Sequence, residues 1–290
     1  MRSRGFITIK AMCHSRQHGL AIMFFGWLFF SAAAAHAQRI SILTPTASPR
    51  DLVYAGRIAE SIPAPARVMD GSLSDAAFRS TAIANPFNMT TAEANRAAAV
   101  IGCDFLVLLH TGGLRRSSFS KPDYFEAFAA HYVVDARTGE LRAWVLKSFE
   151  AATQDAADRA LAASAGETAR ELKSRMIIEN RDAPVFEAVP DPDSAAAADF
   201  KAPIPYRRIK PEYTSIAFLY DVRATIDLEA DIDAEGKIRA TRIVRWAGFG
   251  LEESAENAVR SMNWRPATRK GKPLPMRVLL RYNFTKVGKE

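Results

Sequence analysis

The sequence predicts an α+β protein with an N-terminal α/β layer domain and a C-terminal β-β-α-β domain that holds a three-stranded antiparallel sheet. Two runs in the last third of the chain alternate apolar and polar residues with a period of two, as strands with one buried face do. An amphipathic helix pattern and a third alternating run follow them. Further upstream, a continuous apolar run lies between Ala-rich helical patterns, which is typical of a layered α/β domain.

The first two alternating runs predict a hairpin. Over 225–233 apolar residues alternate with polar ones, and the polar positions include a row of carboxylates: Asp227, Glu229, Asp231 and Asp233. Gly236 closes a short turn, at which we expect a positive φ. The return run over 237–245 carries the basic residues Lys237, Arg239 and Arg245. We therefore expect opposite charges to face each other across the two strands.

The third alternating run predicts the last strand of this domain. A helix is expected from Leu251 to Met262, with acidic residues in its first turn, and prolines turn the chain after it. Over 276–284 the residues on one side of the strand are Met276, Val278, Leu280, Tyr282 and Phe284. With the strands in the order 1-2-3, this last strand lies at a border of the sheet and keeps unpaired main-chain N–H and C=O groups.

Several short motifs of this region occur together in one known family. They are Pro211-Glu-Tyr, Asp233-x-x-Gly236, Val244-Arg-x-x-Gly248-Phe, Ala258-Val-Arg, Trp264-Arg-Pro-Ala267, Gly271-Lys-Pro and Tyr282-Asn-Phe284. Over residues 205–287 the chain resembles the C-terminal domain of the TonB family of energy transducers. Three positions depart from the family pattern: Ala224 stands where the family usually has Gly, Met262 where it often has Trp, and Trp264 where it often has Phe.

The resemblance implies a protein that is not an enzyme and that binds an extended peptide by strand addition. In this family the last strand engages the TonB box of outer-membrane receptors. Partner binding is thereby assigned to Arg277, Val278, Leu279, Leu280, Arg281, Tyr282 and Asn283. Arg277 and Arg281 are then expected to face an acidic or polar peptide from an outer-membrane or periplasmic protein. Strand exchange into a homodimer is an alternative use of the same edge.

Residues 1–37 predict a secretory signal peptide. They carry basic residues and no acidic one, then an apolar core over 20–30, then Ala35-His-Ala37, so we expect cleavage between Ala37 and Gln38 and export to the periplasm. The apolar core is shorter than the roughly 20 residues of a membrane span. The alternative is an uncleaved inner-membrane anchor. The resemblance would then make the protein an energy transducer that couples an inner-membrane, proton-driven motor complex to outer-membrane transport.

Residues 38–180 are predicted to form the α/β domain. Thr90 and Glu93 form a capping box for a helix that Gly102 ends, 105–109 is a buried strand, 111–122 a polar loop and 151–176 one long helix. The apolar strand, the turn over 135–139 and the Ala-rich helix together resemble the N-terminal domain of TolB and CsgG-like periplasmic domains. Residues 181–210, rich in Pro and Ala, predict a linker to the domain over 211–287.

The chain offers few side chains for chemistry. One alternative is a hydrolase with Cys103 as nucleophile and His110 as base, but strand spacing separates the two by about 23 Å, which favours a structural cysteine. The carboxylates over 227–233 lie about 6.6 Å apart along a strand, which favours ion pairs over a metal site. Residues 201–290 carry 18 Lys and Arg against 11 Asp and Glu, without an aromatic stacking platform. We therefore predict no cofactor, no metal and no nucleic acid.

Overall fold

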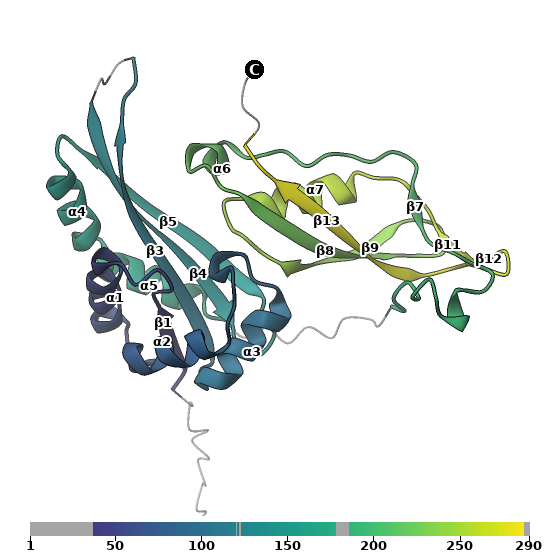
Figure 1. Cartoon of the computed structure of the whole chain (residues 1–290), viewed down its shortest axis with the longest axis horizontal. Coiled ribbons are helices and arrows are strands. Elements are labelled where there is room, and N and C mark those ends of the chain that lie inside the picture. Colours follow the sequence, from purple (N-terminus) through teal and green to yellow (C-terminus); the bar gives the residue numbers. More distant parts are fainter. Residues whose placement is uncertain (1–36, 120, 122, 178–185, 287–290) are drawn as a thin grey trace, which may run out of the picture. The chain divides into compact units, whose positions relative to one another are not determined.

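The computed structural model describes residues 37–119, 121, 123–177 and 186–286. The part up to residue 177, the N-terminal part, begins with a β-α-β-α segment and continues with a long β-hairpin (Figure 1). Its elements are β1 (Arg39–Leu43), α1 (Pro49–Ser61), β2 (Arg67–Val68), α2 (Gly71–Ser80), the 3-10 turn η1 (Pro86–Asn88), α3 (Thr91–Ile101), β3 (Phe105–Arg116), β4 (Tyr124–Asp135), β5 (Leu141–Ala151), α4 (Gln154–Ala163) and α5 (Ala165–Arg175).

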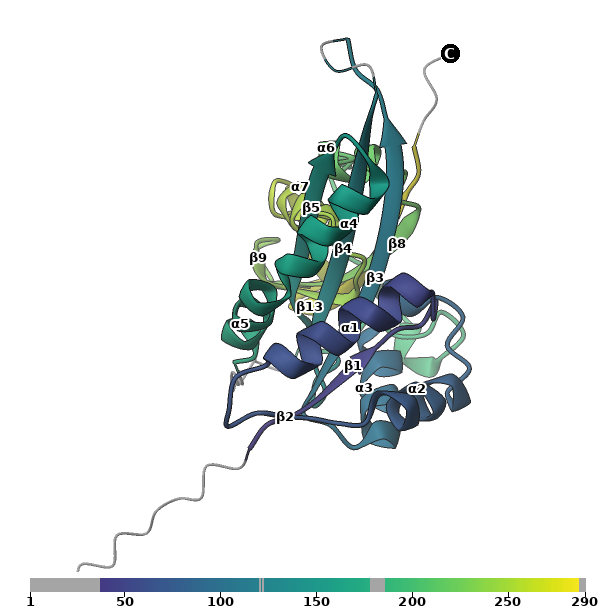
Figure 2. The ribbon, with the colours of Figure 1, turned by 90° about the vertical axis from the view of Figure 1, so that its left-hand side faces the viewer.

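These elements form the predicted α/β layers around one mixed sheet. The strand order is β2-β1-β3-β4-β5; β1 pairs in parallel with β2 and β3, whereas β3, β4 and β5 pair antiparallel. Helices α1, α4 and α5 cover one face, where Ile58, Leu161 and Leu172 pack on the strands, and Figure 2 shows these helices in front of the sheet. Helices α2 and α3 contribute to the packing on the other face.

Local signals in the N-terminal part were correct at the start of α3 and wrong in two other places. The capping box of Thr90 and Glu93 is present, and Gly102 ends α3 with a φ of 78°. The first half of the predicted loop over 111–122 is strand, because β3 continues to Arg116 in register with β4. The single long helix over 151–176 is two helices, α4 and α5, which meet at Ser164.

The C-terminal part, residues 186–286, contains the predicted β-β-α-β unit with additional short elements. They are the 3-10 turn η2 (Ala195–Ala197), β6 (Phe200–Lys201), β7 (Ile204–Pro205), α6 (Ser215–Leu219), β8 (Ala224–Ile232), β9 (Ile238–Arg245), α7 (Leu251–Arg260), β10 (Trp264–Arg265), β11 (Ala267–Arg269), β12 (Lys272–Leu274) and β13 (Met276–Phe284). Gly236 in the β8–β9 turn has the expected positive φ, 81°.

The three-stranded antiparallel sheet is confirmed, but the predicted order 1-2-3 is wrong. The order is β13-β8-β9, so the last strand pairs with the first one. Because β9 and β13 are both antiparallel to β8, they run parallel to each other, and a parallel connection requires a crossover. Helix α7 provides this crossover and packs through Val259 on Leu228 and Ala230 of β8. The strand β13 nevertheless remains at a border of the sheet.

The segment predicted as a linker, 181–210, pairs with the C-terminal part over much of its described length. Strand β6 pairs with β11, strand β7 pairs with β10, and Ala188 forms a parallel bridge with Arg277. This pairing accounts for four short strands, β6, β7, β10 and β11, that the sequence did not predict. The division of the chain into domains over 38–180 and 211–287 stays a prediction.

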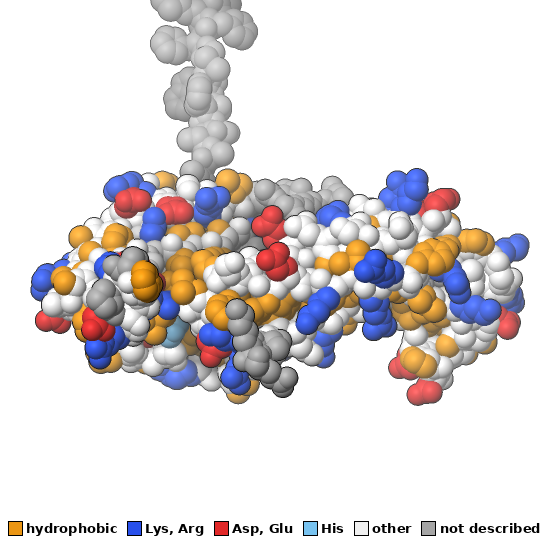
Figure 3. All heavy atoms as spheres, turned by 90° about the horizontal axis from the view of Figure 1, so that it is seen from above, with side chains coloured by type: hydrophobic (Ala, Val, Ile, Leu, Met, Phe, Trp, Pro, Cys, Tyr) orange, Lys and Arg blue, Asp and Glu red, His pale blue; other side chains and the backbone are white. Residues whose placement is uncertain are grey.

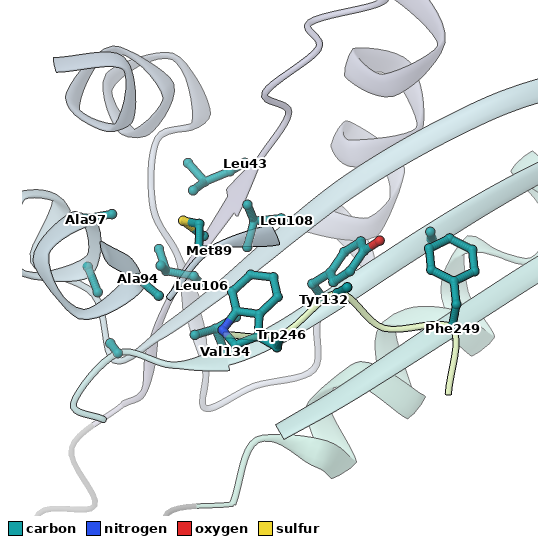
Figure 4. Packing of buried hydrophobic residues seen from close by; sticks show 14 of the residues in the cluster. Leu43, Met89, Ala94, Ala97, Leu106, Leu108, Tyr132, Val134, Trp246 and Phe249 are labelled. Atoms are coloured by element: carbon teal, nitrogen blue, oxygen red, sulfur yellow. The ribbon is translucent and has the colours of Figure 1, made fainter. Parts of the chain in front are cut away.

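The two parts share a hydrophobic core through Trp246, which follows β9 and is fully buried. Figure 4 shows its indole beside Val134 and Tyr132 of β4, and its ring centre lies 5.8 Å from that of Tyr132. The indole Nε1 donates to the Gly139 carbonyl oxygen over 3.1 Å. The core around Trp246 therefore belongs to both parts.

Candidate binding site

The outer edge of β13 is the candidate site, and the main-chain bonds of Arg277 define which of its residues face outward. The Arg277 N–H donates to the Glu187 carbonyl over 2.8 Å, and its carbonyl accepts from the Val189 N–H over 3.3 Å. Since β13 pairs with β8 without a register shift, outward and inward groups alternate along it. Leu279, Arg281 and Asn283 therefore also point their N–H and C=O groups away from β8.

This edge is covered at one end only. The segment Glu187–Val189 occupies the position beside Arg277. Among the described residues, no main-chain group outside the sheet bonds to Leu279, Arg281 or Asn283. The side chain of Leu279 is 62% exposed, which is unusual for a large apolar residue and leaves this stretch accessible. About half of the strand can therefore accept a further strand.

The seven residues predicted to bind a partner divide between the two faces of the sheet. Val278 is buried, and Leu280 and Tyr282 are half-buried on the face that α7 covers. Leu279, Arg281 and Asn283 are exposed on the opposite side, where Arg277 is half-buried. The pattern agrees with the alternation read from the sequence.

Arg277 and Arg281 do not point freely toward a partner as expected, because each is bound to a carboxylate on β8. Arg277 holds Asp231 with two hydrogen bonds of 2.6 and 2.8 Å, and Arg281 holds Asp227 with two of 2.7 and 2.9 Å. These are directly opposed cross-strand pairs, a relation that depends on β13 lying beside β8. The strand order β13-β8-β9 therefore explains why these arginines pair with carboxylates within the sheet.

The row of carboxylates on β8 lies between arginines from both neighbouring strands. On the β9 side Arg245 bonds to Asp227 over 3.1 Å, Arg242 pairs with Glu229, and Arg239 pairs with Asp233. Burial by itself raises the pKa of Asp227, but hydrogen bonds from Arg281 and Arg245 outweigh it and hold that pKa below its ordinary value. The row is thus satisfied by ion pairs, as the sequence favoured, and these pairs hold β13 against β8.

The alternative nucleophile and base do not form a reactive pair. Cys103 is buried, and burial raises the pKa of its thiol to about 12, so the thiolate is not populated at neutral pH. His110 packs instead between the rings of Phe87 and Phe128. Among the described residues, no group of three His, Cys, Asp or Glu side chains is arranged to hold a metal.

The predicted signal peptide lies almost entirely outside the described residues, which begin at Ala37. Gln38, the first residue after the predicted cleavage point, donates through its side chain to the Met176 carbonyl oxygen at the end of α5. No helix within the described ranges is both long and apolar enough to cross a membrane. Figure 3 shows Lys and Arg side chains interspersed with hydrophobic ones on one face of the molecule.

The C-terminal part is a small sheet that one helix covers, with an accessible border strand, and an exposed sheet edge is a place where an extended peptide can add. Residues 209–285 match the family model described as Gram-negative bacterial TonB protein C-terminal. This part of the chain is a TonB C-terminal domain, and the resemblance seen in the sequence is confirmed. Such domains are associated with the cell envelope and bind outer-membrane proteins.

Three solved structures are similar to portions of the chain. The TonB C-terminal domain of Pseudomonas aeruginosa is 17% identical over 32% of this chain and 91% of that one, with a TM-score of 0.26. Lipoprotein GNA1162 from Neisseria meningitidis is 14% identical over 48% and 99%, with a TM-score of 0.30. PelC from Paraburkholderia phytofirmans is 11% identical over 48% and 89%, with a TM-score of 0.26. No curated protein matches the chain.

Two contacts of the site were missed in the sequence. Trp246 anchors the end of β9 to the N-terminal part, and Glu187–Val189 pairs with the edge of β13. Trp246 lies just beyond the alternating run of β9. A large aromatic residue directly after the end of the strand pattern was the available signal for this contact. For Glu187–Val189 the sequence carries no comparable signal, because a short segment between prolines is typical of a linker.

Proposed function

We propose that the protein binds an extended segment of an outer-membrane or other envelope protein by strand addition to β13, without catalysing a reaction, in envelope transport. The observation that carries the proposal is the row of outward main-chain groups at Leu279, Arg281 and Asn283, beside Arg277, which already pairs with a short parallel segment. Main-chain hydrogen bonds along an edge supply affinity, and alternate side chains supply selectivity.

The ion pairs of Arg277 and Arg281 support this function in a different way from the one first expected. A border strand that receives a partner has to remain in register with its own sheet. Bidentate arginine–carboxylate pairs are directional, so they hold β13 against β8 while its other edge is available. In this proposal the arginines are positioning residues for the edge, and the partner contacts the main chain and the side chains between them.

Proline at position 279 tests the proposal. Leu279→Pro removes one outward N–H and leaves every β13–β8 hydrogen bond in place, because the Leu279 N–H does not point toward β8. We expect the full chain to enrich extended peptides from a display library of random ten-residue sequences, and Leu279→Pro to weaken binding of the enriched peptides at least tenfold. Leu279→Ala is the matched control, since it shortens the side chain and keeps the N–H. Equal binding by wild type and Leu279→Pro, with both folded by circular dichroism, would show that this edge does not bind peptides.

The periplasmic location and the released state of the protein rest on the predicted cleavage between Ala37 and Gln38. Mass spectrometry of the exported protein tests it. A first residue of Gln38 supports a released periplasmic protein, whereas an intact N-terminus supports the anchored energy transducer.

A further inference from the structure

The segment Glu187–Val189 is attached to the edge of β13 at a single residue, Arg277. The Arg277 N–H donates to Glu187 and its carbonyl accepts from Val189, and within the described ranges these are the only main-chain bonds between the segment and β13. The Glu187 carboxylate also pairs with Arg269 over 3.0 Å, but the two side chains are 55% and 37% exposed. Ion pairs in contact with solvent contribute little to stability, so few interactions hold this segment in place.

The pairing is kept short on both sides of Arg277. Pro275, immediately before β13, has no N–H, so the pairing cannot extend past the start of the strand. In the other direction the chain turns at 191–194, where the Ser194 N–H donates to the Asp191 carbonyl oxygen over 2.9 Å, and the segment makes no described main-chain bond to Leu279. Residues 187–189 are all exposed, and an exposed segment with two main-chain bonds opens more readily than the sheet itself.

The segment occupies a position that an added strand would also use. The outward residues of β13 are Arg277, Leu279, Arg281 and Asn283. A strand that pairs along the whole edge needs the main-chain groups of Arg277, which cannot bond to two chains at once. The Val189 side chain also lines a groove of about 470 Å³ together with Leu279, so the segment lies next to the accessible part of the edge as well.

From this we infer that Glu187–Val189 is an autoinhibitory strap. It competes with a partner for the edge of β13 at Arg277, and it leaves the edge when a partner strand pairs along all four outward residues. Binding then includes the cost of opening the strap, which lowers the affinity for short or poorly matched strands. This inference rests on the proposed function and adds a device that regulates the same site.

Amide hydrogen exchange of the full chain, followed by NMR, tests whether the strap is closed and whether a partner opens it. In the free protein the Val189 N–H is bonded to Arg277, whereas the Leu279 N–H points outward without a main-chain partner among the described residues. Relative to their intrinsic rates, we expect Val189 to exchange about tenfold more slowly than Leu279. When a peptide enriched from the library saturates the protein, the Val189 N–H should lose its protection while the Leu279 N–H gains protection.

Val189→Pro tests the competition without a change in β13. Proline removes the N–H that the strap donates to Arg277, and Val189 is 38% exposed, so the sheet should remain folded. We expect the enriched peptides to bind Val189→Pro about tenfold more tightly than wild type, which corresponds to 1.4 kcal/mol. Val189→Ala is the matched control, because it shortens the same side chain and keeps the N–H, and its affinity should stay close to that of wild type.

The outcomes separate the strap from the function on which it rests. Equal exchange of the Val189 and Leu279 amides in the free protein would mean that the strap is open in solution and would overturn the inference. Equal peptide affinity of wild type and Val189→Pro, or a Val189 N–H that stays protected in the complex, would also overturn it and leave strand addition intact.

Screening the library on Val189→Pro as well distinguishes a firmly closed strap from an edge that binds nothing. Enrichment on Val189→Pro alone supports both the strap and strand addition. Absence of enrichment on wild type and on Val189→Pro, relative to Leu279→Pro, contradicts the proposed function, and the inference with it.

Discussion

The two sheets of this protein bury their central strands by different means. In the N-terminal part, β4 is covered on both faces, and all but the first two of its residues are buried. In the C-terminal part, β8 buries Ile226, Leu228 and Ala230 against apolar neighbours, while arginines of β9 and β13 cover Asp227 and Asp231 on its other face. The N-terminal sheet therefore has apolar packing on both faces. The C-terminal sheet has apolar packing on one face and ion pairs on the other, and it is a narrow sheet with an accessible border strand.

The core that Trp246 shares with the N-terminal part connects these two kinds of sheet, so its loss should have the largest effect on stability. Trp246→Ala removes a fully buried indole, and we expect the free energy of unfolding to fall by roughly 3–5 kcal/mol. Urea denaturation measures the change. Tyr206→Ala is a suitable control, because Tyr206 is 69% exposed and its loss should change stability by less than about 0.5 kcal/mol. A loss below 1 kcal/mol for Trp246→Ala would mean that the two parts fold independently of this contact.

Acid should destabilise the N-terminal sheet first. Burial lowers the pKa of His131 from 6.5 to about 4, with the Lys147 charge adding to this effect and Glu171 opposing it. Because the pKa of this histidine is lower in the folded protein than in the unfolded chain, the neutral side chain contributes to stability above pH 6.5. That contribution is lost as the pH falls from 6.5 toward 4. Between pH 7 and 4.5 we expect a loss of roughly 2–3 kcal/mol, which His131→Gln should largely remove. Carboxylates with a lowered pKa, such as Asp227, contribute to stability above their ordinary pKa, which is near 4. Their contribution is lost only as the pH falls below that value. If urea denaturation shows the same loss in His131→Gln, the buried histidine is not its cause.

The smallest of the three stability effects belongs to the face of the C-terminal sheet that ion pairs cover. Arg277→Ala leaves the carboxylate of Asp231, which is 3% exposed, without its bidentate partner. We expect the free energy of unfolding to decrease by about 1–3 kcal/mol, because a buried acceptor loses its donors. Arg207→Ala is the matched control on an exposed arginine and should have little effect. Equal stability of the two variants would show that apolar packing alone holds β13 in the sheet.

Much of the candidate site could be predicted from local sequence patterns, while its pairing could not. The period of two over 276–284 correctly assigned Val278 and Leu280 to one face and Leu279 and Arg281 to the other. The same pattern contains no information on which strand lies beside β13. The order 1-2-3 was wrong for that reason, and the pairing of Arg277 and Arg281 with carboxylates of β8 was not predicted.

The sequence by itself determined the long strands and the helix of the C-terminal unit, the faces that their residues occupy and the family of the segment over 209–285, because alternation, capping residues and turn glycines act over a few neighbouring residues. Only the tertiary structure decided that β13 lies beside β8, that Trp246 belongs to a core shared by both parts, and that Glu187–Val189 covers one end of the binding edge. The physical reason is that pairing between distant segments depends on the path of the crossover and on surfaces that exist only once the elements have packed.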